Sequence, residues 1–340
     1  MDTQLLGNTA RAMVAAGKGL LAADESAGTC KKRFDSVGVE STEENRRAYR
    51  EMLFATPKLS DYVSGVILFD ETLRQSTKDG VNFAKYLEAN GIIPGIKVDA
   101  GAHDMALHPG EKATEGLDKL AARMQEYFAM GARFAKWRAV ITIGKGIPTR
   151  ACLDANAHAL ARYSAICQEA SIVPIVEPEV LLDGDHSVET SEEVHLRTLE
   201  TLFHELATQD VLLEHVILKA SMVVSGNRNP RQAGVKEVAE RTVRVLKRTV
   251  PAALPGVVFL SGGQGDQDAT AHLDAMNRMG GLPWPLTFSY SRALQQMALN
   301  TWRGKAANVR EAQAALAHRA RMNSLAARGQ WSAEAEKKAA

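Results

Sequence analysis

Short apolar runs alternate along this chain with longer mixed segments of helical periodicity. The runs are rich in Val, Ile, Leu and Phe, which is typical of strands buried on both faces of a parallel sheet. We predict eight such strands, over residues 18–24, 65–70, 93–99, 134–140, 172–177, 216–222, 256–261 and 285–290. Their regular spacing leaves room for a helix between each strand and the next.

Helical patterns fill several of these intervals. Ser41-Thr42-Glu43-Glu44 has the serine and glutamate spacing of a capping box, which predicts a helix running to residue 54. Apolar residues recur at helical spacing over 117–130, and a start signal at Ser191 predicts a helix running towards 208. We predict further helices over 236–247, 266–279, 292–302 and 306–328, and the last of these is long, alanine-rich and charged.

Repeated strand–helix units without a linker or a composition break favour the α/β class. The simplest arrangement is a single (β/α)8 TIM barrel domain over residues 1–340, with 329–340 as a short C-terminal tail. A doubly wound sheet is the alternative, but it usually has a G-x-G-x-x-G turn after the first strand. This chain has Asp24-Glu25-Ser26-Ala27-Gly28-Thr29 there.

Ionisable residues stand at the C-terminal ends of the predicted strands, where barrel enzymes hold their active sites. Side chains alternate along a strand, so Lys136 and Arg138 share one face, as do Glu177 and Glu179. Three lysines are interleaved with several carboxylates in this set, which comprises Asp24, Asp70, Glu71, Lys97, Asp99, Lys136, Arg138, Glu177, Glu179 and Lys219. So many ionisable strand ends predict one polar site in the barrel mouth.

Lys219 has the most specific chemical implication of these residues. It follows the apolar run Val216-Ile217-Leu218. Burial favours the neutral amine, which is a nucleophile able to form a Schiff base with a ketone or aldehyde. A lone lysine there is more often the partner of a buried carboxylate or the first exposed residue after a strand, but the neighbouring strand ends favour catalysis.

A glycine-rich loop follows the seventh predicted strand. Ser261-Gly262-Gly263-Gln264-Gly265 precedes a helix, and its glycines let backbone N–H groups approach an anion. Barrels often bind phosphate with the loops after strands seven and eight, and Arg292 follows strand eight. The loop alone predicts no more than a turn, but beside an arginine it predicts phosphate binding.

Composition narrows the function classes. The 340 residues include 41 Lys+Arg and 40 Asp+Glu, a balance that gives no support to nucleic-acid or membrane partners. Three cysteines (Cys30, Cys152 and Cys167) without a CxxC pair indicate a reducing compartment. We see no membrane span and no secretory signal, so we expect a cytoplasmic protein. The nine histidines are scattered without metal-binding spacing, so we expect no metal site.

Several segments together closely resemble class I fructose-bisphosphate aldolase. They occur in the family's order between Gly19 and Gly329, which covers nearly the whole chain. The segments are LAADES from Leu21, TEENRR from Thr42, GVILF from Gly65, GIKVD from Gly95, FAKWR from Phe134, IVEPE from Ile175, FLSGGQ from Phe259 and LTFSY from Leu286.

The resemblance implies a fold, an activity and a substrate. It implies a (β/α)8 barrel that reversibly cleaves fructose 1,6-bisphosphate to dihydroxyacetone phosphate and glyceraldehyde 3-phosphate. The reaction would proceed through a lysine Schiff base with no metal or other cofactor, in glycolysis and gluconeogenesis. The partner would be a sugar phosphate, and members of the family are often homotetramers.

The resemblance also implies residue roles. Lys219 would be the Schiff-base lysine, Glu177 the acid/base in carbinolamine dehydration, and Asp24 the base for carbon–carbon cleavage. Lys136 would assist proton transfer and Glu179 would orient the lysines. Contacts to substrate and phosphate are implied for Ser26, Arg33, Lys97, Arg138, Ser261, Gly262, Gly263, Ser289, Ser291 and Arg292. Like charges oppose protonation, so we also expect the clustered amines to lower one another's pKa values.

The chain departs from the family pattern at three places. Ala220-Ser221 stands where the family usually has Pro-Asn, and Ser291 where it usually has glycine. The family's C-terminal tyrosine has no counterpart, since the last tyrosine of this chain is Tyr290. The alternatives that remain are a Schiff-base aldolase for a sedoheptulose or monophosphate substrate, a metal-dependent aldolase, and an inactive barrel that serves as a scaffold.

Overall fold

Parallel strands close into a barrel in the computed structural model, which describes residues 1–337. Within those residues eight strands form the barrel, in the spatial order β1-β10-β9-β8-β7-β6-β3-β2. Their bounds are β1 Gly19–Ala23, β2 Val63–Leu68, β3 Ile93–Lys97, β6 Phe134–Ile141, β7 Val173–Val180, β8 Ile217–Ala220, β9 Gly256–Phe259 and β10 Leu286–Tyr290. A two-stranded hairpin of β4 (Gly101–Asp104) and β5 (Lys112–Glu115) follows β3. The prediction of a (β/α)8 barrel is confirmed.

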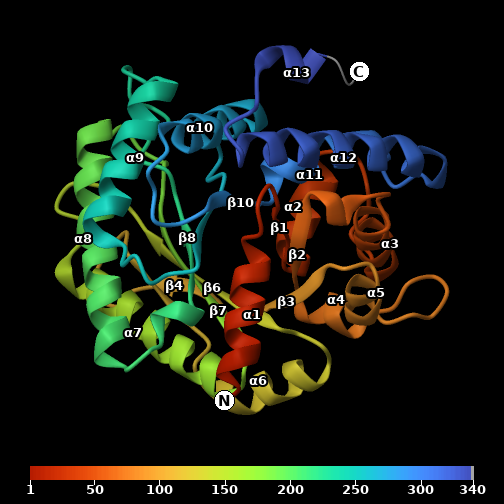
Figure 1. Ribbon diagram of the computed structural model, residues 1–340, viewed down its shortest axis with the longest axis horizontal. Helices are drawn as coiled ribbons and strands as arrows, with labels where there is room; N and C mark the ends of the chain where they lie inside the picture. Colours follow the sequence, from red (N-terminus) through yellow and green to blue (C-terminus); the bar gives the residue numbers. More distant parts are fainter. Residues whose placement is uncertain (338–340) are drawn as a thin grey trace.

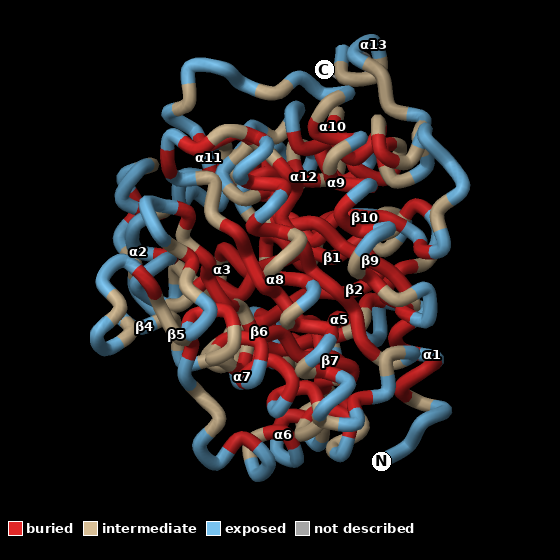
Figure 2. Tube along the Cα trace, turned by 90° about the vertical axis from the view of Figure 1, so that its left-hand side faces the viewer, coloured by how far each residue is buried: buried red, intermediate tan, exposed pale blue. Residues whose placement is uncertain are grey.

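Helices surround the barrel, and α12 runs across one side of it (Figure 1). The α-helices are α1 Thr3–Met13, α2 Ala27–Asp35, α3 Glu43–Phe54, α4 Asp70–Arg74, α5 Phe83–Ala89, α6 Leu120–Ala129, α7 Arg150–Glu169, α8 Val188–Thr208, α9 Val235–Thr249, α10 Asp266–Met279, α11 Arg292–Trp302, α12 Val309–Ala326 and α13 Ala333–Lys337. Short 3-10 turns are η1 Leu59–Asp61, η2 Leu213–His215 and η3 Ala306–Asn308. Buried segments concentrate in the barrel strands and on the inward faces of these helices (Figure 2).

The interior of the barrel is apolar at the end where the strands begin. Ile175 and Ile217 pack there with Phe134, and α1 closes the end by adding Leu6 and Met13 to the same cluster. The helix α1 was not predicted from the sequence. Because a strand's side chains alternate, the next inward positions after this apolar layer lie nearer the barrel mouth, and there they are ionisable.

One strand glycine is required by this packing. A Cβ at Gly95 would lie 2.2 Å from the ring of Phe134, so any larger residue would displace that ring from the barrel interior. Phe134 itself is fully buried. Gly95 therefore lets β3 approach the ring of Phe134, which fills the barrel interior beneath the polar mouth.

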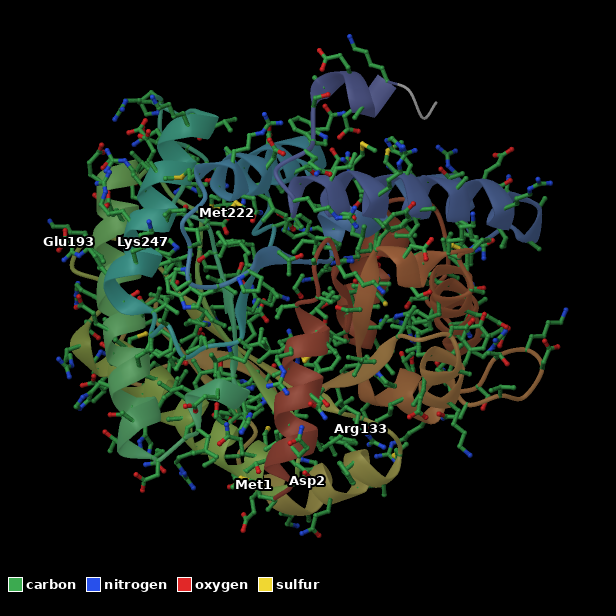
Figure 3. All side chains as sticks on the ribbon, viewed as in Figure 1. Met1, Asp2, Arg133, Glu193, Met222 and Lys247 are labelled. Carbon is green, nitrogen blue, oxygen red and sulfur yellow. The ribbon has the colours of Figure 1, made fainter. Side chains whose placement is uncertain are left out.

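The outer helices carry the charged surface. Glu193 on α8 and Lys247 on α9 are exposed, whereas Met222, just beyond β8, is buried (Figure 3). This difference in exposure is expected for a barrel surrounded by helices, because apolar side chains fill the space between the strands and the helices.

Strand predictions agree with the structure within a few residues, but several helix starts were wrong. Thr42, not Ser41, caps α3, because its hydroxyl accepts from the Asn45 N–H. Similarly, Ser187 caps α8 by accepting from the Thr190 N–H, so that helix begins before Ser191.

Two other predicted helices also differ from the structure. The segment 117–130 becomes helical only at Leu120, because Lys119 adopts a left-handed conformation. The segment 306–328 is divided into the turn η3 and the helix α12. The predicted tail contains α13, and its residues 338–340 lie outside the described part of the chain.

Candidate active site

A cavity of about 480 Å³ opens at the C-terminal ends of the barrel strands. Residues from β1, β3, β6, β7, β8, β9 and β10, or from the loops that follow them, line its wall. The lining residues are Ala22, Asp24, Glu25, Thr29, Lys32, Arg33, Ser36, Lys97, Lys136, Arg138, Glu177, Glu179, Lys219, Leu260, Ser261, Gly262, Ser289, Ser291 and Arg292. The structure thus brings together most of the residues that the sequence predicted.

Four buried ionisable groups form the floor of this cavity. Lys219 Nζ lies 3.1 Å from Glu177 Oε1. Lys136 Nζ lies 3.1 Å from Glu177 Oε2 and 2.7 Å from Asp24 Oδ2. Each of the four residues is at most 9% exposed. The distances are short enough for direct proton transfer between neighbouring groups.

The charges in this cluster compensate one another. Burial opposes ionisation of Asp24 and Glu177, but Lys136 and Lys219 outweigh burial and lower the pKa of both carboxyls. Burial likewise opposes the charge on Lys136, yet Asp24, Glu177 and Asp99 raise its pKa. The expectation that the amines lower one another's pKa values is therefore wrong for Lys136, because the carboxylates that contact it raise its pKa.

A second set of ion pairs lies around this floor. Lys97 Nζ is 2.7 Å from Asp99 Oδ1, and the other Asp99 oxygen accepts from the Arg138 backbone N–H at 3.2 Å. The Arg138 guanidinium pairs with Glu179. Asp99 thus links the ends of β3 and β6 and holds Lys97 against the cavity wall. Asp99 was predicted at a strand end, but no role was predicted for it from the sequence.

The opposite wall can bind an anion. Gly262 has a φ of +57° and Gly263 a φ of +96°, left-handed conformations that favour glycine. Arg292 begins α11 and lines the cavity beside Ser261 and Gly262. Ser289 Oγ is buried and, among the described residues, has no hydrogen-bond partner. An unpaired buried hydroxyl beside an arginine and a glycine turn fits an oxygen-rich group such as phosphate.

Two of the predicted phosphate residues do not line this cavity. Ser26 caps α2, where its hydroxyl accepts from the Thr29 N–H at 3.4 Å. Gly263 lines a neighbouring depression of about 270 Å³, which it shares with Arg292. Both residues therefore shape the loops that carry the cavity wall.

Several residues that line the cavity were not predicted. They are Ala22, Glu25, Thr29, Lys32, Ser36 and Leu260. Glu25 follows Asp24 directly, and this position next to a predicted base could have identified it as a residue of the site. Lys32 and Ser36 belong to the short helix α2 and the turn after it, and no strand-end rule could have identified them.

Tyr290 is not available to replace the family's C-terminal tyrosine. Its side chain is fully buried, and its hydroxyl donates to the Ala269 carbonyl at 2.9 Å. Burial also raises the pKa of the Tyr290 hydroxyl above its usual value. Among the described residues, the buried acid–base group paired with Lys219 is Glu177, whose other carboxylate oxygen lies 3.1 Å from Lys136 Nζ.

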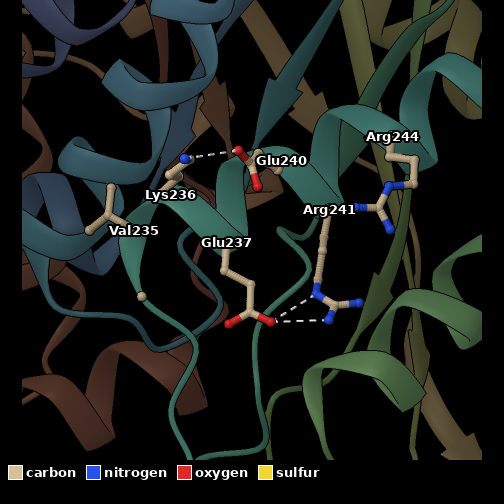
Figure 4. A pocket seen from close by; sticks show the side chains of 7 residues that line it. Val235, Lys236, Glu237, Glu240, Arg241 and Arg244 are labelled. Atoms are coloured by element: carbon tan, nitrogen blue, oxygen red, sulfur yellow. Dashed lines mark hydrogen bonds and ion pairs between the residues drawn. The ribbon is translucent and has the colours of Figure 1, made fainter.

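Another depression, of about 620 Å³, lies along the N-terminal half of α9 and shares no lining residue with the barrel cavity (Figure 4). Its charged side chains pair with one another. Lys236 is 3.7 Å from Glu240, and Arg241 is 3.0 Å from Glu237. No group of metal-binding side chains was found among the described residues, and none of their helices is long and apolar enough to cross a membrane.

Known proteins are similar to this chain over nearly its whole length. The family model described as "Fructose-bisphosphate aldolase class-I" matches residues 5–340. A protein of Xanthomonas campestris pv. campestris, named a probable fructose-bisphosphate aldolase class 1, is 61% identical and covers 97% of this chain and 99% of its own length. Fructose-bisphosphate aldolase 1 of Toxoplasma gondii is 53% identical over 96% of this chain and 90% of its own.

A solved structure shares the fold over nearly the whole chain. It is a fructose-bisphosphate aldolase from Plasmodium falciparum, in complex with TRAP and a small-molecule inhibitor. Its TM-score is 0.95 at 49% sequence identity, over 97% of this chain and 95% of the other.

Proposed function

Because the chain belongs to the class I fructose-bisphosphate aldolase family, we propose that Lys219 is the amine through which it cleaves its substrate. The enzyme is a metal-independent aldehyde-lyase that converts fructose 1,6-bisphosphate to dihydroxyacetone phosphate and glyceraldehyde 3-phosphate. The observation that carries the assignment is a buried lysine whose Nζ lies 3.1 Å from a buried carboxylate, on the floor of a polar cavity.

The first stage builds the Schiff base. Glu177 takes a proton from Lys219, and the neutral amine attacks the ketone carbon to form a carbinolamine. Glu177 then returns a proton to the carbinolamine hydroxyl, which leaves as water. Lys136 stays protonated between Asp24 and Glu177 and balances the charge as the proton moves.

The second stage breaks the carbon–carbon bond. Asp24 takes the proton of the hydroxyl on the carbon next to the bond, and that carbon becomes the aldehyde of glyceraldehyde 3-phosphate. The bonding electron pair moves towards the protonated imine and leaves an enamine on Lys219. Protonation of the enamine and hydrolysis of the imine release dihydroxyacetone phosphate and restore the amine.

Charged side chains on opposite walls hold the two phosphates. Ser261, Gly262, Ser289 and Arg292 surround the phosphate next to the ketone. Lys97 and Arg138 face the distal part of the substrate, where Asp99 and Glu179 fix their orientation. Glu179 therefore acts by positioning its partner.

A coupled cleavage assay tests this function directly. Fructose 1,6-bisphosphate is the expected preferred substrate, and fructose 1-phosphate and sedoheptulose 1,7-bisphosphate are the competitors to compare by kcat/KM. Lys219→Ala should fold normally and show no cleavage. A wild-type protein that cleaves none of these sugars would contradict the proposal, and a preference for either competitor would change the substrate.

Assembly and location extend the proposal. We infer a homotetramer acting in the cytoplasm, on the strength of the family relationship. Light scattering after size-exclusion chromatography should give a mass about four times the 36.8 kDa of one chain. A mass of one or two chains would contradict the tetramer.

A further inference from the structure

Ser291 stands between the last barrel strand and α11, directly before Arg292, at the place where the resembled family usually has glycine. It occupies the N-cap position of α11, yet its side chain makes no capping hydrogen bond to that helix. Instead its hydroxyl donates to Glu25 Oε1 at 2.8 Å and accepts from Arg33 Nη2 at 3.0 Å. The hydroxyl thus connects the loop after β10 to the loop and helix after β1.

Glu25 is a fixed anchor for this connection. It is 6% exposed, and the carboxylate oxygen that accepts from Ser291 also accepts from Arg33 and from Gln295 Nε2. Its other oxygen pairs with Arg50 at 3.2 Å. Burial alone would raise the Glu25 pKa, but Arg33 and Arg50 lower it, so the carboxylate is ionised.

The surroundings of Glu25 are rigid. Gln295 and Arg50 are each 1% exposed. Gln295 accepts from the Tyr49 hydroxyl at 3.0 Å and donates to the Ala22 carbonyl at 2.6 Å, and Arg50 donates to the Glu25 carbonyl at 2.9 Å. A buried network with this many partners holds its members in one arrangement.

Arg33 is the cationic member of the network that lines the substrate cavity. Its side chain is 17% exposed and lines the cavity with Arg292. One of its terminal nitrogens bonds Glu25 and the other bonds Ser291. A guanidinium has five N–H donors, so Arg33 keeps donors for an anion while these two contacts fix its plane.

We propose that Ser291 is a positioning residue that, by bridging Glu25 and Arg33, holds the Arg33 guanidinium ready to bind a substrate phosphate. Its hydroxyl hydrogen is committed to Glu25, so Ser291 acts on the phosphate through Arg33 rather than by direct contact. With glycine at 291 the guanidinium is held by Glu25 alone. Fixing a binding group beforehand lowers the entropic cost of gripping the ligand, so the serine strengthens binding.

The test is a double-mutant cycle on Ser291 and Arg33. The variants are Ser291→Ala, Arg33→Ala and the double variant, each assayed for cleavage of fructose 1,6-bisphosphate and for competitive inhibition by inorganic phosphate. Ser291→Ala should raise both KM and the phosphate inhibition constant about three- to tenfold, the usual effect of losing one hydrogen bond. Its kcat should stay within about twofold. In the Arg33→Ala background the same substitution should add nothing, because the group through which Ser291 acts is gone.

Two further variants separate binding from folding. Ser291→Gly introduces the residue usual in the family and should behave like Ser291→Ala. It can therefore be assayed in its place if the Ser291→Ala protein fails to fold. Ser187→Ala removes a helix-capping hydroxyl outside the cavity, so it should lower thermal stability and leave KM unchanged.

Three results would overturn the inference. They are an unchanged KM in both Ser291 variants, an equal rise in KM with and without Arg33, and a loss of stability and kcat at constant KM. The inference rests on the proposed phosphate site, but the two can fail separately. Wild-type cleavage of the bisphosphate with an insensitive Ser291 leaves the proposed function standing, whereas absent wild-type cleavage refutes the proposed function itself.

Discussion

At the scale of single residues, the site depends on alternating charge. Asp24, Lys136, Glu177 and Lys219 follow one another across the cavity floor as acid, base, acid, base. Burying a single charge costs free energy, and the opposite charges beside each of these groups offset that cost. A proton can therefore move between members while the net charge of the group stays constant, which suits a reaction that both removes and returns protons.

Lys136→Met tests that compensation. The substitution keeps an unbranched side chain of similar size but leaves Asp24 and Glu177 buried without their shared cation. Removing one partner of a buried ion pair typically costs about 3–5 kcal/mol, so urea unfolding should show a loss of that order, together with a large fall in kcat. Lys145→Met replaces an exposed lysine and serves as the control. Unchanged stability and kcat in Lys136→Met would show that Lys136 is not the shared cation.

Arg292→Ala tests the phosphate wall. Losing a charge-assisted contact typically costs about 1.5–3 kcal/mol, so KM for fructose 1,6-bisphosphate should rise on the order of tenfold to a hundredfold. Steady-state kinetics measures this directly. Arg310→Ala, which removes an exposed arginine from the start of α12, should leave KM as it is. If Arg292 only anchors its helix, the variant will instead lose stability at constant KM.

At the scale of elements, side chains connect the end of β7 to the segment that follows β8. Their backbone pairing is limited to Ile175 with Ile217 and Val176 with Leu218. Beyond it the Val180 N–H donates to Ser221 Oγ at 3.1 Å, and Ser221 Oγ lies 2.9 Å from His195 Nε2. Ser221, two residues after Lys219, therefore links the end of β7 to the segment that follows β8.

His195 makes this junction sensitive to acid. Its Nδ1 donates to the Ser191 carbonyl at 2.7 Å, so Nε2 accepts from Ser221 only while the ring is neutral. Burial lowers the His195 pKa to about 4, from 6.5 for an ordinary histidine. The unfolded chain therefore binds more protons between those values, and the free energy of unfolding must fall as pH drops from 6.5 towards 4.

His195→Gln tests this acid sensitivity. Urea unfolding of the wild-type protein should show about 2 kcal/mol lost through His195 between pH 7 and pH 5, and the variant should lack that part of the slope. His204→Gln replaces an exposed histidine on the same helix as a control. Parallel slopes in wild type and His195→Gln would contradict a buried neutral His195.

The sequence predicted strands better than helix starts, and the reasons are local. The strand β8, for example, begins in the apolar run Val216-Ile217-Leu218, which is short enough to favour a strand over a helix. Helix starts depend on which of several neighbouring hydroxyls captures a backbone N–H, and Thr42 rather than Ser41 does so in α3. The Glu25–Arg33–Ser291 bridge could not be predicted, because it joins residues 266 positions apart through side-chain geometry.

At the scale of the whole molecule, the barrel keeps packing and chemistry at opposite ends. The apolar cluster beneath the site includes α1, and the ionisable groups stand above it. Mutations in the apolar cluster should therefore alter stability alone, whereas those in the lining of the cavity should alter kinetics as well.

Metal removal tests the chemistry of the whole molecule. The protonated imine already supplies the electron sink, so EDTA should leave kcat and KM for fructose 1,6-bisphosphate unchanged after dialysis. A metal-dependent aldolase would lose activity and regain it with zinc. That recovery would contradict the assignment of chemistry to Lys219.

Covalent trapping tests the central claim most directly. Borohydride added with dihydroxyacetone phosphate should reduce the imine and attach the three-carbon unit irreversibly to one lysine. Peptide mapping by mass spectrometry should find it on Lys219, and Lys219→Ala should take up none. Label on Lys136 or Lys97, or no label on an active wild-type enzyme, would contradict the account.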